Sequence, residues 1–218
     1  MRNQQSGFTL VEIAIVLVII GLLLGGVLKG QELVNSAKVK NLVNDFRGIS
    51  SFVYAYQDRF RAMPGDDSAA ATHVNGGTKA TTPNATLANA RINGDWNSTT
   101  TTDESYLFWQ HVRLAGLATG TPTVGNADYI PRNAEGGAIG ITGDPVLTAP
   151  VVAYPGTFYV CSTGIQGRYA RQIDSTIDDG NGETGSVRFL ANATASQAKA
   201  EVVTPADDAK LYTVCMAF

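Results

Sequence analysis

The residues with the clearest potential for metal chemistry lie in an acidic loop near the carboxyl end of the chain. Within the run 178–185, four side chains carry oxygen atoms that could bind a metal: Asp178, Asp179, Asn181 and Glu183. Calcium takes about six to eight oxygen ligands, and a glycine-rich loop can fold side-chain and carbonyl oxygens around one ion. The loop lacks the ligand spacing of an EF-hand, and a solvated Asx turn explains the same residues without a metal. Calcium bound by these four residues is one expectation, and a turn without a metal is the other.

A second unusual group is the carboxylate of Glu12, the single charge in the apolar run 8–28. This run is long enough to cross a bilayer as a helix. A charged residue inside such a span costs about 2.5 to 3.5 kcal/mol on insertion scales, so it indicates a function and a partner. A cleaved secretory signal is an alternative because Arg2 precedes the run. However, the run is longer than the usual signal core, and no small-residue cleavage site with a polar start follows it.

No recognisable catalytic pattern is present in the chain. There is no nucleophile elbow, HExxH, P-loop, dinucleotide-binding fingerprint in a strand context or paired zinc-ligand spacing. His111 has no second histidine or cysteine nearby, so we expect a hydrogen-bonded packing residue rather than a metal ligand. We therefore do not expect this protein to be an enzyme.

The residues around Glu12 resemble a known amino-terminal segment. Residues 6–12 (Ser-Gly-Phe-Thr-Leu-Val-Glu), followed by an aliphatic run, are similar to the leader and amino terminus of type IV pilins and of type II secretion pseudopilins. The resemblance implies that a prepilin peptidase removes residues 1–7 by cutting between Gly7 and Phe8, and that Phe8 is then N-methylated. It also implies that Glu12 pairs with the free amine of Phe8 in a neighbouring subunit, which would compensate its charge.

Small residues in the apolar run are candidates for a role in assembly. Gly21, Gly25, Gly26 and Gly30 form two pairs at the four-residue spacing that lets helix backbones approach closely. In pilins this segment is where subunits bundle, and part of the helix can unwind. Glycine lowers the cost of unwinding, since it is about 1 kcal/mol worse than alanine in a helix. Lys29 stands where many pilins carry proline, so the choice between close packing and unwinding stays open. Glycine is also common in membrane helices that do neither.

One long helix is expected to carry this segment. Apolar residues recur at intervals of three and four from Val39 to Phe60, and the sequence around Pro64 stops the pattern. We therefore predict one helix from about residue 8 to about 61. Its part 8–28 is the transmembrane and assembly segment, and its amphipathic part 29–62 packs on a globular domain, 63–218.

The predicted fold class is α+β, a pilin-like long helix packed on a small antiparallel sheet. Residues 66–102, rich in Thr, Asn, Ala and Gly, are predicted to be a surface loop with little core of its own. A helix is predicted over 103–117, with Asp103 as N-cap and Gly116 at its end, and a second over 168–177. Short apolar runs indicate strands: 129–131, 138–141, 151–154, 157–161, 186–190 and 211–216.

The two cysteines, Cys161 and Cys215, stand in apolar stretches. In an oxidising compartment they are expected to form one disulfide between strand 157–161 and the last strand, and otherwise they are buried thiols. The leader resemblance and the cysteine pair together favour export. We then expect residues 8–28 in the inner membrane before assembly and the carboxyl-terminal domain in the periplasm. Afterwards the subunit would lie in a cell-surface pilus or a periplasmic pseudopilus.

The net charge of −3 gives no basic excess, so general nucleic-acid binding is not expected. The leading hypothesis is a structural subunit of a type IV pilus-like filament, a helical homo-oligomer that depends on prepilin peptidase and an assembly machinery. One alternative is a pseudopilin of a type II secretion system. Another is a monomeric, membrane-anchored adhesin or binding domain that uses 66–102 for recognition.

Overall fold

The computed structural model describes residues 9–83, 88–147, 154–191 and 198–218. Contacts divide the chain into two units, Met1–Lys38 and Val39–Phe218, and each is described by itself. Helix α1 (Leu10–Phe60) runs through both. The elements that follow it, in chain order, are α2 (Ala70–His73), α3 (Glu104–Leu114), β1 (Ile139–Thr142), β2 (Tyr159–Gln166), α4 (Gly167–Ile177), β3 (Val187–Ala191), the 3-10 turn η1 (Pro205–Asp207) and β4 (Leu211–Ala217).

The character of α1 changes at Val39. Before this residue its apolar side chains are exposed, from Leu10 at 88% to Val34 at 58%. From Val39 onward one stripe is buried at helical spacing: Val39, Leu42, Val43, Phe46, Ile49, Ser50, Val53 and Tyr56. The long helix and its amphipathic second part are therefore confirmed, although burial begins later than the predicted boundary at 29.

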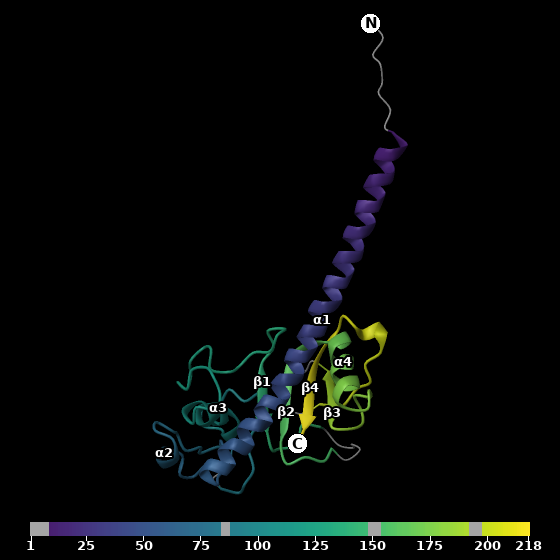
Figure 1. Ribbon diagram of the computed structural model, residues 1–218. Helices are drawn as coiled ribbons and strands as arrows, with labels where there is room; N and C mark the ends of the chain where they lie inside the picture. The colour runs from purple at the N-terminus through teal and green to yellow at the C-terminus, as the bar shows by residue number, and fades with distance from the viewer. Residues whose placement is uncertain (1–8, 84–87, 148–153, 192–197) are drawn as a thin grey trace. The chain divides into compact units, whose positions relative to one another are not determined.

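The four strands form one antiparallel sheet in the order β1-β2-β4-β3 (Figure 1). Four of the predicted strand segments correspond to these strands. Strand β2 is longer than predicted and continues to Gln166 across a register shift between Ser162 and Ile165. The predicted strand 129–131 is wrong, because Tyr129 is a buried side chain in a loop and its carbonyl accepts a hydrogen bond from Arg113 Nη1 at 2.6 Å. Most of the predicted strand 151–154 lies outside the described residues.

Alternation along the strands separates two of the core clusters of the second unit. Val160 and Val214 belong to the larger cluster, together with most of the buried stripe of α1 and Ile173 of α4. Tyr159 and Cys161 belong to a smaller cluster on the opposite face. This is the predicted α+β architecture.

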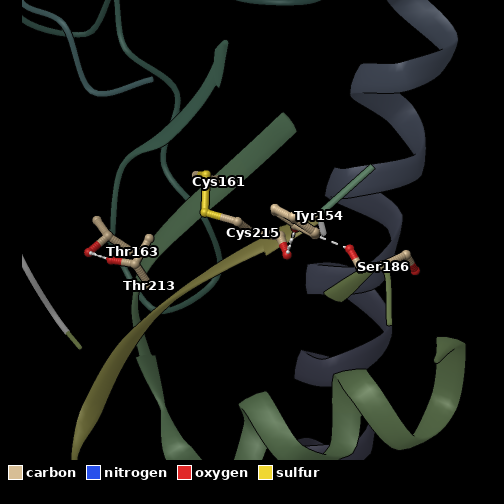
Figure 2. Close-up of a disulfide and its surroundings, with 6 residues drawn as sticks. All are labelled: Tyr154, Cys161, Thr163, Ser186, Thr213 and Cys215. Carbon is tan, nitrogen blue, oxygen red and sulfur yellow. Dashed lines mark hydrogen bonds between the residues drawn. A yellow bond between two sulfur atoms is a disulfide. The ribbon is translucent and has the colours of Figure 1, made fainter. Parts of the chain in front are cut away.

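The predicted disulfide is confirmed. Cys161 and Cys215 are directly opposite each other in β2 and β4 and are bonded, as Figure 2 shows. Both are fully buried. The Tyr154 hydroxyl donates to the carbonyl of Cys215 at 2.8 Å and lies near that of Ser186 at 3.1 Å. The bridge therefore fixes the last strand inside a hydrogen-bonded part of the sheet.

The segment 66–102 differs from the predicted surface loop. It contains the short helix α2 and contributes buried side chains to the domain: Ala70, Val74, Ala80, Ile92 and Trp96. These residues have no helical or strand period. Within the segment, described residues between 88 and 94 are held by hydrogen bonds to carboxylates.

The first of these carboxylates is the buried side chain of Asp66. It accepts hydrogen bonds from the backbone N–H groups of Ala88 and Arg91. Ala88 and Ala90 have positive φ angles of 59° and 62°. Left-handed residues of this kind let neighbouring N–H groups converge on one anion. The stretch 88–91 is thus attached to Asp66 through its main chain.

Two further carboxylates, those of Glu104 and Asp144, accept hydrogen bonds from residues 93 and 94. Glu104 accepts the N–H of Asn93 at 2.7 Å, and Asp144 accepts the N–H of Gly94 at 2.7 Å. Burial, and then the charges of Asp66, Asp144 and Asp103, raise the pKa of Glu104 to about 7, while the N–H of Asn93 offsets part of this rise. The hydrogen bonds that attach residues 93 and 94 therefore come from acidic side chains that lie close together.

Helix α3 is buried along most of its length. Asp103 occupies the N-cap position but makes no side-chain capping bond, and it accepts instead from the hydroxyls of Thr82 and Ser98. Gly116, with a φ of 73°, follows the helix end as predicted.

His111 is the predicted packing residue. Its Nδ1 accepts the N–H of Gly65 at 2.9 Å, so the ring proton is on Nε2, which donates to the carbonyl of Thr78 at 2.8 Å. Burial lowers the pKa of His111, which keeps the ring neutral. Both ring nitrogens are used within the chain, and this confirms a structural role.

Candidate functional site

The described part of the amino-terminal segment begins at Thr9, so the predicted cleavage and methylation residues Gly7 and Phe8 lie outside the described residues. Glu12 lies in the first turn of α1. Its Oε2 accepts hydrogen bonds from the backbone N–H and the hydroxyl of Thr9 at 2.8 and 2.9 Å. The N–H of Glu12 donates back to Thr9 Oγ1 at 3.2 Å.

This reciprocal arrangement is a capping box, which satisfies two N–H groups at the start of a helix. Sequence reasoning identified Glu12 but missed Thr9. The pattern Thr-x-x-Glu ahead of an apolar run was the signal that could have found it.

The glycine residues of the apolar run lie within the unbroken helix α1. A Cβ atom added to Gly21, Gly25 or Gly26 would meet none of the described residues within 4 Å. Their predicted roles in close helix packing or local unwinding stay predictions.

Comparison with known protein families gives one match, over residues 2–28, to the family described as Prokaryotic N-terminal methylation motif. This is the signature of type IV pilins and pseudopilins. The pilin-type motif implies processing by prepilin peptidase and pilus or secretion assembly, and its family consists of structural subunits that are generally not enzymes. No curated protein and no solved structure matched the chain.

The apolar start of α1 agrees with this pilin-type motif. Among the described residues, α1 is the helix that is long and apolar enough to cross a membrane. The motif and the helix together fit anchoring in the inner membrane before assembly.

The acidic loop after α4 forms the second candidate site, with a ligand set that differs from the predicted one. Asp174, Asp178 and Asp179 each offer a carboxylate oxygen within 4.8 Å of the others. Asp174 was missed because it lies on the preceding helix. Glu183 is exposed and outside this group, and the side-chain oxygen of Asn181 accepts the N–H of Glu183 at 3.2 Å in an Asx turn.

Asp174 is the unusual member of the group. Its side chain is fully buried, and neither oxygen has a hydrogen-bond partner among the described residues. Burial, and then the charges of Asp178 and Asp179, raise its pKa to about 7. The backbone N–H of Gly180 and the charge of Arg188 offset part of this rise in the pKa. A buried carboxylate without partners is costly, so Asp174 needs a proton or a cation.

The other two carboxylates are held in place by the loop. Asp178 accepts the N–H of Val187 at 2.7 Å, and Asp179 accepts the hydroxyl of Thr184 at 2.5 Å. Gly185 has a φ of 71°, and a Cβ there would lie 2.1 Å from Asp178 Oδ2, so only glycine fits at this position. The loop therefore keeps both carboxylates beside Asp174.

Proposed function

We propose that this chain is a structural subunit of a type IV pilus-like filament. The observation that carries the proposal is the methylation motif over residues 2–28, which continues into an apolar helical surface that the described chain leaves uncovered. Such a surface needs lipid before assembly and other helices afterwards. In that setting the Glu12 carboxylate is costly unless it is paired, so pairing with the Phe8 amine of a neighbour would favour one register.

The proposal gives the subunit a defined route. Prepilin peptidase cuts after Gly7, Phe8 is N-methylated, and the apolar helix holds the subunit in the inner membrane with its second unit in the periplasm. The subunit then joins a helical homo-oligomer. The disulfide between Cys161 and Cys215 supports an oxidising compartment for this unit.

The test compares Glu12→Ala and Glu12→Gln with Glu32→Gln, a control at an exposed carboxylate further along α1. We expect both Glu12 variants to be processed and retained in the membrane without forming filaments, while the control assembles normally. Filaments are counted by electron microscopy, and the mature amino terminus is identified by mass spectrometry. Normal filament yield for Glu12→Ala, or an intact Met1 in the wild type, would refute the proposal.

A pseudopilin of a type II secretion system is the second candidate, because the same motif marks both classes. It would form a short periplasmic polymer, so the wild type would give subunit cross-links in the periplasm without surface filaments. A monomeric adhesin is the third hypothesis, and it predicts full function without Glu12. The burial of Ile92 and Trp96 leaves less of the segment 66–102 available for recognition than that hypothesis assumed.

We also propose that Asp174, Asp178 and Asp179 bind one calcium ion. Their separations fit a single ion, since two oxygens that each lie about 2.3 to 2.6 Å from calcium are at most about 5 Å apart. The unpartnered carboxylate of Asp174 supports the proposal, because a cation would replace the proton that burial otherwise requires. Three carboxylates fill part of the coordination shell, which leaves places for water or carbonyl oxygens.

The calcium proposal is tested on the full-length protein in detergent at pH 7.5. Trp96 and Trp109 are the two tryptophans of the chain and both are buried in the second unit, so their fluorescence reports the unfolding of that unit. We expect millimolar calcium to raise the melting temperature of the wild type and of Asp128→Asn, an exposed control, but not of Asp174→Asn. An unchanged wild-type melting temperature in calcium and in chelator would exclude the site.

A further inference from the structure

We propose that Asn75 is a site of spontaneous deamidation, in which the backbone nitrogen of Gly76 attacks the side-chain amide. The chain has three Asn-Gly pairs, at 75–76, 93–94 and 181–182. Asparagine reacts in this way most readily before glycine, which has no side chain to hinder the attack and a freely rotating backbone. The contacts described below leave the first pair free and hold the other two. This inference is independent of the proposed filament function.

The reaction needs no reactant other than water. The N–H of Gly76 loses its proton, the nitrogen forms a bond to Cγ of Asn75, and the bond from Cγ to Nδ2 breaks, so that the amide nitrogen leaves as ammonia. Water then opens the resulting succinimide ring at one of its two carbonyl groups. The product is aspartate or isoaspartate, and both carry a carboxylate where the neutral amide was.

The turn that carries Asn75 leaves this path open. Residues 74–77 form a turn closed by the N–H of Gly77, which donates to the carbonyl of Val74 at 2.9 Å. Gly76 has a φ of 84°, which agrees with the third position of a type II turn. Asn75 and Gly76 are both exposed. Among the residues that the structure describes, none forms a hydrogen bond with the Asn75 side chain or with the Gly76 N–H.

The second pair is held by a carboxylate. The N–H of Gly94 donates to Asp144 Oδ2 at 2.7 Å, and Asn93 Nδ2 donates to Asp144 Oδ1 at 3.1 Å. Asn93 is buried, and its Oδ1 accepts from Asn89 Nδ2 at 2.8 Å. The attack would require both groups to leave Asp144, whose charge also disfavours loss of the Gly94 proton. Asn93 is therefore protected in the folded protein.

The third pair is restrained by packing. Asn181 Oδ1 accepts the N–H of Glu183 in the Asx turn described above, so the side chain is already engaged. A Cβ at Gly182 would lie 2.1 Å from the ring of Phe189, and the N–H of Phe189 donates to the Gly182 carbonyl at 3.1 Å. Close packing of this kind limits the backbone movement that ring closure needs.

Nearby charge also separates the first pair from the third. Residues 70–80 contain neither aspartate nor glutamate, whereas Asp179 and Glu183 each stand two positions from Asn181. Negative charge near the attacking nitrogen disfavours its deprotonated form. The exposed turn at Asn75 therefore combines a free side chain, a free N–H and the absence of acidic neighbours in the sequence.

The three pairs can be followed separately, because trypsin places them in the peptides 62–79, 92–113 and 172–188. The full-length protein in detergent is incubated at pH 7.5 and sampled over weeks, and mass spectrometry measures aspartate and isoaspartate in each peptide. We expect peptide 62–79 to convert at least about tenfold faster than 92–113, the factor that one hydrogen bond to a charged group implies. It should also convert clearly faster than 172–188.

Two controls make the test specific. In Asn75→Gln the peptide 62–79 should stay unmodified, since glutamine would have to close a larger ring. In guanidinium chloride, which unfolds the chain and screens its charges, the three wild-type peptides should convert at similar rates.

An unmodified peptide 62–79 in the folded wild type, or equal conversion of the three peptides, would refute the inference. The same ranking of rates in the unfolded chain would also refute it, because the protection of Asn93 and Asn181 would then not come from the structure.

Discussion

Replacing Asp174 with asparagine should change how the stability of the second unit depends on pH. In the folded protein Asp174 keeps its proton up to about pH 7, whereas in the unfolded chain it loses it near its ordinary pKa of 3.8. Between these values the folded state binds more protons, so the free energy of unfolding of the wild type falls as pH rises from about 4 to about 7. The amide of Asp174→Asn cannot ionise, and this contribution should disappear.

The size of the effect follows from the pKa of Asp174. A rise of this pKa from 3.8 to about 7 lowers the free energy of unfolding by roughly 4 kcal/mol between pH 4 and pH 8 in the absence of calcium. Full burial of the side chain means that solvent does little to screen this cost. Glu104, with a pKa also raised to about 7, contributes in the same direction. The free energy of unfolding of the wild type should therefore fall more steeply with pH than that of Asp174→Asn, and the double variant with Glu104→Gln should show a still smaller fall.

The assay is urea unfolding of the full-length protein in detergent with chelator, followed by tryptophan fluorescence at several pH values from 4 to 8. Asp128→Asn, at an exposed loop position, is the matched control and should keep the wild-type slope. An Asp174→Asn protein with the wild-type slope would refute the reasoning. It would mean that Asp174 reaches water or finds a partner in solution.

Three further predictions concern the stability of the same unit. Replacing both Cys161 and Cys215 with alanine should lower the free energy of unfolding by about 4 kcal/mol, given their separation of 54 residues, and a loss in urea unfolding below about 1 kcal/mol would contradict the role of the bridge. His111→Leu leaves the N–H of Gly65 and the carbonyl of Thr78 unpaired, so we expect a loss of about 2 to 4 kcal/mol and a lower melting temperature; an unchanged value would show that water replaces the ring. Gly65→Ala should lower the melting temperature clearly more than Gly136→Ala. Both glycines have a positive φ, but only at Gly65 would the added Cβ lie 2.4 Å from a backbone oxygen, that of Glu104. Equal melting temperatures of the two variants would contradict this clash.

The sequence predicted the parts of the fold that depend on periodic burial. The stripe from Val39 to Tyr56, the four strands and the pairing of Cys161 with Cys215 all have local patterns that match the structure. The conformation of residues 88–94 could not be predicted, because their hydrogen-bond acceptors include Asp144, about fifty residues further along the chain.

Of the two candidate sites, one could be predicted from the sequence and the other could not. Thr9 and Glu12 lie one helical turn apart, so their capping box was visible in the sequence. Asp174 was not recognisable, because an acidic residue on a helix usually lies on the solvated face. Only the packing of α4 and the return of the loop to Val187 show that this carboxylate is buried beside Asp178.

The attachment of residues 88–91 to Asp66 has a consequence for how this surface tolerates substitution. These four residues are exposed, and the bonds that attach them to Asp66 come from main-chain N–H groups. Every amino acid except proline carries that group, so most replacements would keep the bonds to Asp66, although replacing Arg91 would also remove its contacts with Gly143 and Asp144. The positive φ at Ala88 and Ala90 adds a preference for glycine, asparagine or aspartate at those two places. Such a patch can change its exposed side chains while the fold beneath it stays the same.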